Sequence, residues 1–181
     1  MIELKQVTFQ YENAPESVYS VHNVDLTIQN GECVVLCGRS GCGKTTITRL
    51  INGLIPHYYE GKLSGHVSVD GVEIKNQQLS KISQHVGSVF QNPRSQFFNV
   101  DTTSELAFGC ENQGLPKEDV LRRIAEAANR FSLNGLLNRS ILSFPAVRNN
   151  GLHAPAFMQF IRIFLFWMSR LPIWTLLLFC N

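Results

Sequence analysis

A glycine-rich stretch, GRSGCGKTT over residues 38–46, has the residue types and the spacing that hold phosphate groups. It fits G-x-x-x-x-G-K-[ST], with Gly38, Gly43, Lys44 and Thr45 at the defining positions. Glycines let successive backbone N–H groups converge on phosphate oxygens, and the N-terminus of the next helix adds partial positive charge. The lysine can reach the β- and γ-phosphates, and the threonine hydroxyl can bind Mg²⁺. The alternative is a glycine loop with a structural role only. A nucleotide site is favoured because the motif lies between an apolar strand and a helix, where a phosphate loop must lie.

Hydrophobic periodicity predicts the elements that position this loop. Alternating apolar and polar residues predict strands over 2–11 and 24–32, and the Asn-Gly turn ending the second suggests antiparallel pairing. CVVLC, residues 33–37, is apolar throughout, which predicts a strand buried on both faces of a parallel sheet. A helix to about Asn52 follows the loop. Residues 65–74 predict a strand-turn-strand with an Asp-Gly turn.

Three further elements are expected along the chain. Residues 85–91 predict another buried strand. Thr102 and Glu105 form a capping-box pattern that opens a short helix to about Gly109. A second helix is expected from Pro116 to Phe131, with one apolar face made of Val120, Leu121, Ile124, Ala125 and Ala128.

Composition narrows the class of protein. The chain has 181 residues, enough for one domain with a sizeable core, and 44% of them are hydrophobic. The net charge of +2 comes without a Lys/Arg run, which argues against a nucleic-acid partner. Three of the five cysteines cluster near the phosphate loop, and we favour small buried core residues over a zinc site. The odd cysteine count and the lack of a signal peptide favour a reducing cytosol.

These features resemble the ATP-binding subunit of ABC transporters, most closely the energy-coupling-factor type that powers vitamin and metal-ion importers. The resemblance covers residues 1–142. VTFQY looks like the segment whose aromatic, here Tyr11, stacks on adenine; a surface aromatic at a strand end is the alternative. VFQNP, residues 89–93, looks like the Q-loop, where Gln91 would sense Mg²⁺ and the attacking water, and the next loop would meet the membrane subunit.

The resemblance implies an α/β fold: a P-loop NTPase (RecA-like) core with the ABC antiparallel β subdomain and an incomplete helical subdomain. It implies ATP and Mg²⁺ as ligands, a second ABC ATPase subunit and a membrane transporter subunit as partners, and a place on the cytoplasmic face of the cell membrane. Gln91 would be catalytic, and Thr45 and Gln91 would bind the metal. The nucleotide-binding residues would be Tyr11, Gly38, Ser40, Gly41, Gly43, Lys44, Thr45 and Thr46.

Beyond Leu142 the chain departs from the family pattern. That pattern requires a Leu-Ser-Gly-Gly-Gln signature, an apolar strand ending in Asp-Glu, and a switch histidine, whereas this chain offers only Leu142-Ser143. All 14 acidic residues lie at or before Glu126, so no later carboxylate can hold Mg²⁺ or act as a general base. His153 is the only later histidine, and nothing places it at the switch position.

The genetic code offers an explanation of this tail. If each original codon joined the third base of one codon to the first two of the next, Phe166-Trp167-Met168 would encode Leu-Asp, and Trp174-Thr175 would encode a second Asp. The junctions between them permit Glu-Pro-Thr-Ser-Asn-Leu, which completes the family's Asp-Glu strand and the loop after it. The same register over residues 143–151 permits Leu-Ser-Gly-Gly-Glu-Lys-Gln-Arg, close to the signature.

We therefore expect residues 1–142 to be a partial ABC ATPase domain and residues 143–181 to be an off-frame tail, not a native domain. Such a chain would bind ATP at most. The alternative is a membrane-anchored P-loop nucleotide-binding protein whose apolar tail, Phe157–Cys180, is functional, although Arg162, Arg170 and Pro172 interrupt it. A buried core helix is a further alternative for this tail, but its sequence shows no polar face and no helical period. A small P-loop nucleotide kinase is disfavoured by the Q-loop pattern and the paired N-terminal strands.

Overall fold

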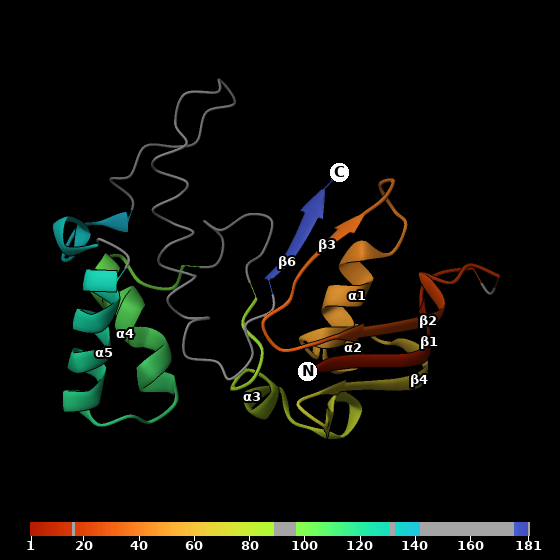
Figure 1. Cartoon of the computed structure of the whole chain (residues 1–181), viewed down its shortest axis with the longest axis horizontal. Coiled ribbons are helices and arrows are strands. Elements are labelled where there is room, and N and C mark those ends of the chain that lie inside the picture. Colours follow the sequence, from red (N-terminus) through yellow and green to blue (C-terminus); the bar gives the residue numbers. More distant parts are fainter. Residues whose placement is uncertain (16, 89–96, 131–132, 142–175, 181) are drawn as a thin grey trace. The chain divides into compact units, whose positions relative to one another are not determined.

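The structure is a computed structural model of the whole chain. It describes residues 1–15, 17–88, 97–130, 133–141 and 176–180 (Figure 1). Two compact units are present, one made of residues 1–88 with 171–181 and the other of residues 89–170. Among the helices of the described ranges, none has both the length and the hydropathy that a membrane crossing requires.

The first unit contains an antiparallel sheet in the order β2-β1-β4-β5. Its strands are β1 (Ile2–Tyr11), β2 (Val21–Ile28), β4 (Gly61–Val69) and the short β5 (Val72–Glu73). Both predicted N-terminal strands are present, although the second covers residues 21–28 and not 24–32, and they pair antiparallel with Ile2 opposite Ile28. The Asn-Gly turn that suggested this pairing does not make it, because it leads from β2 into β3, which belongs to another sheet. The predicted Asp-Gly turn joins β4 to β5, with Asp70 and Gly71 both at positive φ.

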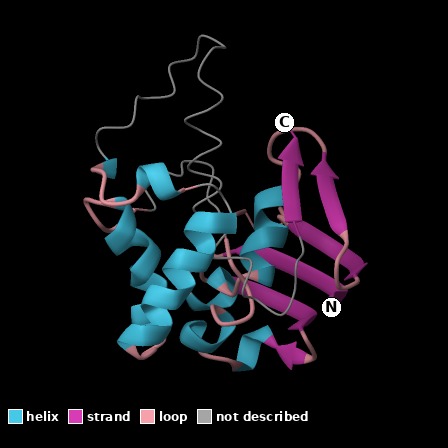
Figure 2. Cartoon of the chain, turned by 60° about the vertical axis from the view of Figure 1, so that its left-hand side comes forward, coloured by secondary structure: helices cyan, strands magenta, loops and turns pink. Residues whose placement is uncertain are grey.

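One face of β1 supplies the core of this unit. Leu4 and Val7 are both buried although they are three residues apart, because a bulge at Gln6, where φ is 49°, shifts the register between them. Helix α1 (Lys44–Ile51) follows the phosphate loop as predicted, and its Leu50 and Ile51 are buried in the same cluster. In Figure 2 this helix lies alongside the strands of the sheet. The buried cluster therefore links the phosphate-loop helix to β1.

The elements after β5 differ in part from the prediction. They are η1 (Ile74–Asn76) and α3 (Leu79–Ile82), and a short helix α2 (Leu54–His57) precedes β4. A strand was predicted over residues 85–91, but residues 85–88 form a turn and irregular backbone, so that part of the prediction is wrong. The backbone N–H groups of His85 and Val86 instead bond back to the carbonyl of Ile82, which ends α3 in a turn. The remainder of the predicted strand lies outside the described residues.

The strand before the phosphate loop has the predicted bounds but not the predicted burial. β3 (Cys33–Cys37) pairs in parallel with β6 (Leu176–Cys180), which the sequence did not predict. Val35 is 46% exposed. The expectation of a strand buried on both faces is wrong because, in the described residues, β6 is the sole strand paired with β3, and burial on both faces needs a wider sheet covered by helices.

The expected burial of the cysteines is wrong near the phosphate loop. Cys33, Cys37 and Cys42 are exposed, because the first two lie on this narrow sheet and the third lies on the loop itself. Cys110, in the second unit, is buried as expected.

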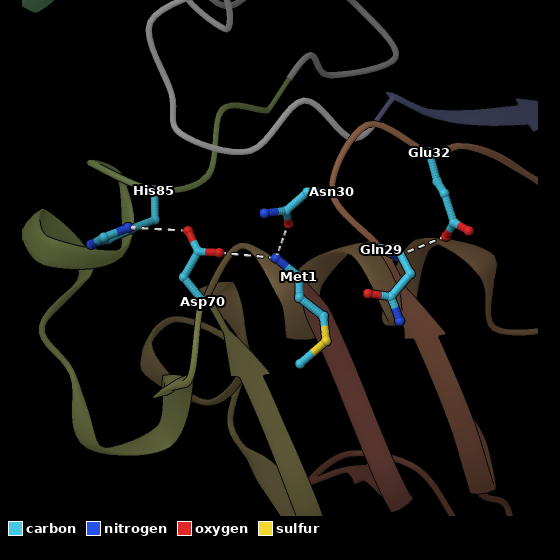
Figure 3. A network of polar contacts seen from close by, with 6 residues as sticks. All are labelled: Met1, Gln29, Asn30, Glu32, Asp70 and His85. Carbon is cyan, nitrogen blue, oxygen red and sulfur yellow. Dashed lines mark hydrogen bonds and ion pairs between the residues drawn. The ribbon is translucent and has the colours of Figure 1, made fainter.

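Polar contacts stabilise one end of the antiparallel sheet, where β1 begins and β2 ends (Figure 3). From this end the chain continues into β3. The Met1 amino group donates to Asp70 Oδ1 at 2.9 Å and also to the Asn30 side chain. The backbone N–H of Gln29 donates to Glu32 Oε2 at 2.7 Å, closing the turn between β2 and β3. This turn thereby sets where β3, and the phosphate loop after it, begins.

The second unit is built on two helices, α4 (Thr102–Asn112) and α5 (Lys117–Arg130), followed by η3 (Asn134–Leu136). Both helices are confirmed, but the apolar face of α5 is shifted from the prediction. Leu121 is 56% exposed and Ala125 is also exposed, whereas Ala127 is buried beside Ala128. The shift arises because α4 packs against the stripe that Val120, Ile124 and Ala127 form.

The N-terminus of α4 is capped differently from the predicted capping box. Asp101, not Thr102, is the N-cap, and its Oδ1 accepts from the backbone N–H of Ser104 at 2.9 Å. Glu105 is buried and its carboxylate accepts instead from the N–H groups of Phe98 and Asn99. The prediction failed because Asp101 competes for the same role one residue earlier, and a carboxylate is at least as good a cap as a threonine hydroxyl.

Replacing Asp101 by Ala is expected to lower the free energy of unfolding by about 1 kcal/mol at neutral pH. Hydrogen bonds from Ser104 hold the pKa of the Asp101 carboxyl below its ordinary value. The stabilisation is therefore present above the pKa of an unfolded Asp, about 3.9, and is lost as the pH falls through the lower folded-state pKa.

Urea unfolding of the full chain at several pH values checks this prediction. Glu111→Ala is the matched control, because it removes a carboxylate at the other end of α4, where a negative charge does not favour the helix. An Asp101→Ala variant as stable as the parent at pH 7 would contradict the assignment of the cap.

Candidate nucleotide-binding site

The phosphate loop connects β3 to α1 in the first unit, as the sequence predicts. Helix α1 begins at Lys44, directly after Gly43. The first four backbone N–H groups of a helix have no partner within it, so they point out of the N-terminus and can bond an anion. Ser40 and Gly41 lie at the exposed tip of the loop, before this N-terminus.

Gly43 cannot be replaced without distorting the loop. Its φ is +94°, in the left-handed region that side chains with a Cβ avoid. A Cβ built on it would lie 2.4 Å from the carbonyl oxygen of Ser20 and 3.0 Å from Val21. The loop therefore packs directly on the start of β2, and this contact sets where α1 begins.

Gly43→Ala is expected to lower the free energy of unfolding by about 2 kcal/mol or more, since it combines left-handed strain with a backbone clash. Gly41→Ala is a matched control, because Gly41 has a φ of +81° but its added Cβ would meet nothing within 4 Å. The difference between the two urea midpoints then isolates the clash with Ser20. Equal midpoints would show that the loop is not packed on β2.

Lys44 is held over the loop. Its side chain is largely buried, and its Nζ donates to the carbonyl oxygens of Gly38 at 2.6 Å and Arg39 at 3.0 Å. Cys42 Sγ lies 3.8 Å from the same ammonium group. The loop thus surrounds one cation with its own oxygens beside the helix N-terminus, which makes a compact positive centre.

The two threonines after Lys44 face different surroundings. Thr45 is exposed in the first turn of α1, so its hydroxyl is available to a ligand or metal ion. Thr46 is buried, and its Oγ1 lies 3.4 Å from Tyr11 Oη. The contribution that Thr46 can make to a phosphate is therefore its backbone N–H, while its side chain joins the loop helix to β1.

Tyr11 lies at the end of β1, half-buried beside α1. Its ring meets Phe9 edge-on, with 4.8 Å between centroids, and Tyr59 edge-on at 6.1 Å. Its hydroxyl accepts a hydrogen bond from Arg49 Nη1 at 2.9 Å. The structure therefore places Tyr11 one side chain from the phosphate-loop helix, and its hydroxyl is fixed by that helix.

Sequence reasoning missed Arg49 and Tyr59. Arg49 lies on α1, and its guanidinium carbon is 4.0 Å from the ring centroid of Tyr59. A paired aromatic, Tyr58-Tyr59, just before a strand was the available signal, but nothing in the sequence shows that it approaches β1. Gln91, the remaining predicted site residue, lies outside the described residues.

Comparison with known proteins decides the family. A family model described as ABC transporter matches residues 21–147, which include the phosphate loop and more than half of the chain. The chain belongs to the ABC transporter family. Its fold is that of an ABC ATPase: a P-loop NTPase core with an antiparallel β subdomain, and the described helices of the second unit are consistent with an incomplete helical subdomain.

Curated relatives of this ABC ATPase domain carry matching names. A putative ABC transporter ATP-binding protein of Treponema denticola is 48% identical over 141 residues, covering 78% of this chain and 28% of its own length. Another from Pyrococcus abyssi is 42% identical over 133 residues, covering 74% of this chain and 47% of its own length. The chain thus spans well under two thirds of these relatives.

A solved structure shows the same fold at low sequence identity. CbiO1 from Clostridium perfringens, described as part of the ABC transporter complex CbiONQ, superposes with a TM-score of 0.77 and 18% identity. That superposition covers 99% of this chain and 78% of CbiO1. At this identity the likeness supports the fold alone.

Proposed function

We propose that this chain is the ATP-binding part of an ABC importer ATPase of the energy-coupling-factor type, holding MgATP without hydrolysing it. The observation that carries the proposal is Lys44, held over the phosphate loop at the N-terminus of α1. Support for the importer type comes from the resemblance of the first 142 residues, and the shared fold of CbiO1 is consistent with it.

Binding would exchange contacts that the loop already makes. The Lys44 ammonium would pass from the carbonyls of Gly38 and Arg39 to the β- and γ-phosphates, and the N-terminal N–H groups of α1 would bond phosphate oxygens. Thr45, exposed beside them, would bind Mg²⁺. Tyr11, one side chain away from the same helix, would stack on adenine.

The residues that activate water in the family have no counterpart in this chain after Glu126. No Asp or Glu follows that position, so neither the metal-binding Asp nor the general-base Glu of the family pattern is present. Gln91 is our candidate for sensing Mg²⁺ and the attacking water. A glutamine amide is not basic enough to remove a proton from water, so without the Glu of the family pattern we expect hydrolysis to be negligible.

We further propose that residues 143–181 are translated out of frame. The forced Asp codons and the permitted signature support this, and the relatives above align over 133 to 141 of the 181 residues. Strand β6 does not argue otherwise, because an apolar edge such as β3 can pair its backbone with any extended apolar segment. A nucleotide sequence without the hidden motifs downstream of codons 140–145 would end this proposal.

The repaired protein would pair with a second ABC ATPase subunit and act on a membrane transporter subunit at the cytoplasmic face of the membrane. Two solved structures with the same fold are consistent with this in their own descriptions: CbiO1 is part of a transporter complex, and the cassette MJ0796, 20% identical with a TM-score of 0.68, is described as dimeric. The alternative is a functional membrane anchor over residues 157–180. Residues 157–175 of that segment lie outside the described residues, and its end, residues 176–180, forms β6.

Isothermal titration calorimetry tests the proposed binding. The full chain should bind ATP saturably with one site per chain and more tightly with Mg²⁺ than with EDTA, because Thr45 would then complete a metal site beside the phosphates. Heats that never saturate, with or without Mg²⁺, would reject the proposed function.

A further inference from the structure

A group of three side chains, Tyr11, Arg49 and Tyr59, joins the end of β1 to the phosphate-loop helix, and we call it the tyrosine clamp. Arg49 Nη1 donates to Tyr11 Oη at 2.9 Å, and the Arg49 guanidinium lies 4.0 Å from the Tyr59 ring centroid. The Tyr59 ring meets the Tyr11 ring edge-on with an interplanar angle of 85°, an arrangement that aromatic pairs favour. Each member of the clamp therefore contacts both others.

We propose that Arg49 and Tyr59 are positioning residues that orient the Tyr11 ring toward the nucleotide base and so set the affinity of the base end of the site. The inference rests on the proposed function and deepens it, because it assigns the base end to residues outside the phosphate-loop motif. The phosphate end is held by Lys44 through separate contacts with Gly38 and Arg39.

The clamp restricts a side chain that would otherwise rotate. Tyr11 is the last residue of β1, where a ring has fewer strand neighbours to hold it. Arg49 fixes the hydroxyl end of the ring, Thr46 lies 3.4 Å from the same oxygen, and Phe9 borders the ring from within the strand. A ring already held in its bound orientation loses less conformational entropy when a base stacks on it.

Backbone packing maintains the same geometry from the other side. In the β1–β4 pairing, Tyr11 lies opposite Gly61. Gly61 follows Tyr59 by only two residues. A Cβ on Gly61 would lie 2.2 Å from the carbonyl oxygen of Gln10 and 2.7 Å from the Phe9 ring. This close approach brings the segment that carries Tyr59 against the end of β1, within reach of Arg49.

Arginine suits this role better than lysine. A planar guanidinium can donate in its plane to Tyr11 Oη while its face lies on the Tyr59 ring, whereas an ammonium group offers no flat face. Arg49→Lys keeps the charge but loses the combined geometry. The clamp therefore predicts that Arg49→Lys binds MgATP more weakly than the parent. A general electrostatic role for Arg49 predicts no such change, because the charge is kept.

The test compares two ligands on the full chain by calorimetry: MgATP, which has a base, and magnesium tripolyphosphate, which has none. Arg49→Ala should weaken MgATP binding about five- to thirty-fold and leave tripolyphosphate binding within about twofold, as expected for the loss of one charge-assisted hydrogen bond and one cation–π contact. Arg49→Lys should weaken MgATP binding at least about threefold. Arg122→Ala, an exposed arginine on α5, is the matched control and should change neither affinity.

A second readout reports on stacking itself. The fluorescence of bound 1,N6-etheno-ATP should be quenched by stacking on Tyr11 in the parent chain, and this quenching should decrease in Arg49→Lys and Tyr59→Leu at saturating ligand. Tyr59→Phe keeps the ring beneath Arg49 and should retain the quenching. Circular dichroism melts of each variant identify any that do not fold. If one of the larger changes prevents folding, Arg49→Lys and Tyr59→Phe test the positioning role.

The outcomes separate this inference from the proposed function. MgATP affinity unchanged in Arg49→Ala and Arg49→Lys, or an equal loss for MgATP and tripolyphosphate, would overturn the positioning role while leaving nucleotide binding intact. A parent chain that binds tripolyphosphate as tightly as MgATP would also overturn it, because the base would then contribute nothing. A parent chain that binds neither ligand would reject the proposed function and the inference together.

Discussion

Lys44→Ala is expected to weaken MgATP binding by about 10- to 150-fold, the equivalent of about 1.5–3 kcal/mol for hydrogen bonds to a charged group. The ammonium group is largely buried and already lies beside the N-terminus of α1, so it can meet the phosphates without a large rearrangement. Alanine removes the ammonium group at the lysine position of the phosphate-loop motif and leaves the backbone N–H groups in place. Weakened binding, not a lost fold, is therefore the expected result.

Calorimetry of the variant and the parent at equal ionic strength measures this loss. Lys75→Ala is the matched control, since Lys75 is an exposed lysine in η1 of the same unit. Tripolyphosphate binding should fall together with MgATP binding in Lys44→Ala, in contrast to the variants of the tyrosine clamp. An affinity equal to that of the parent would show that the loop is not a nucleotide site.

Repair of the reading frame is expected to have the larger effect. Insertion of one base near codon 142 should replace residues 143–181 with the hidden signature and the Asp-Glu strand. β3 is now exposed along one face, and a further strand would widen its sheet so that helices can cover that face. The restored Glu would act as general base and the restored Asp would complete the Mg²⁺ site beside Thr45.

Phosphate release measures the effect of the repair. The repaired chain should hydrolyse ATP at least about 100-fold faster than the present chain, and changing the restored Glu to Gln should lower its rate by about 10²- to 10⁴-fold, the usual contribution of a general base. A repaired chain no more active than the present one would contradict the hidden reading of the tail.

The sequence predicted the elements whose signals are local. β1 and β2 alternate in burial, the Asp-Gly pair turns β4 into β5, and α1 follows the phosphate loop, because backbone geometry and one packed face decide each of them. Burial of β3 was predicted wrongly because an apolar run shows what a strand could bury, not whether neighbouring strands are there to cover it. The same holds for Leu121, which is exposed although it fits the apolar pattern.

At the site, the phosphate end was predictable and the base end was not. Lys44 and Gly43 are fixed by spacing within one loop, so a motif identifies them. Arg49 and Tyr59 act through contacts with Tyr11, which is 38 and 48 positions away in the chain, and no local pattern predicts such contacts. The close approach of Gly61 to β1, which brings them together, is visible only in three dimensions.

MgATP binding and phosphate release, measured on one preparation of the present chain, show whether the chain binds ATP without hydrolysing it. We expect saturable MgATP binding and a rate of phosphate release equal to that of Lys44→Ala, because the chain keeps the phosphate loop and has no Asp or Glu after Glu126 to activate water. Phosphate release clearly above that of Lys44→Ala would contradict this expectation, since the tail would then supply the missing catalytic groups.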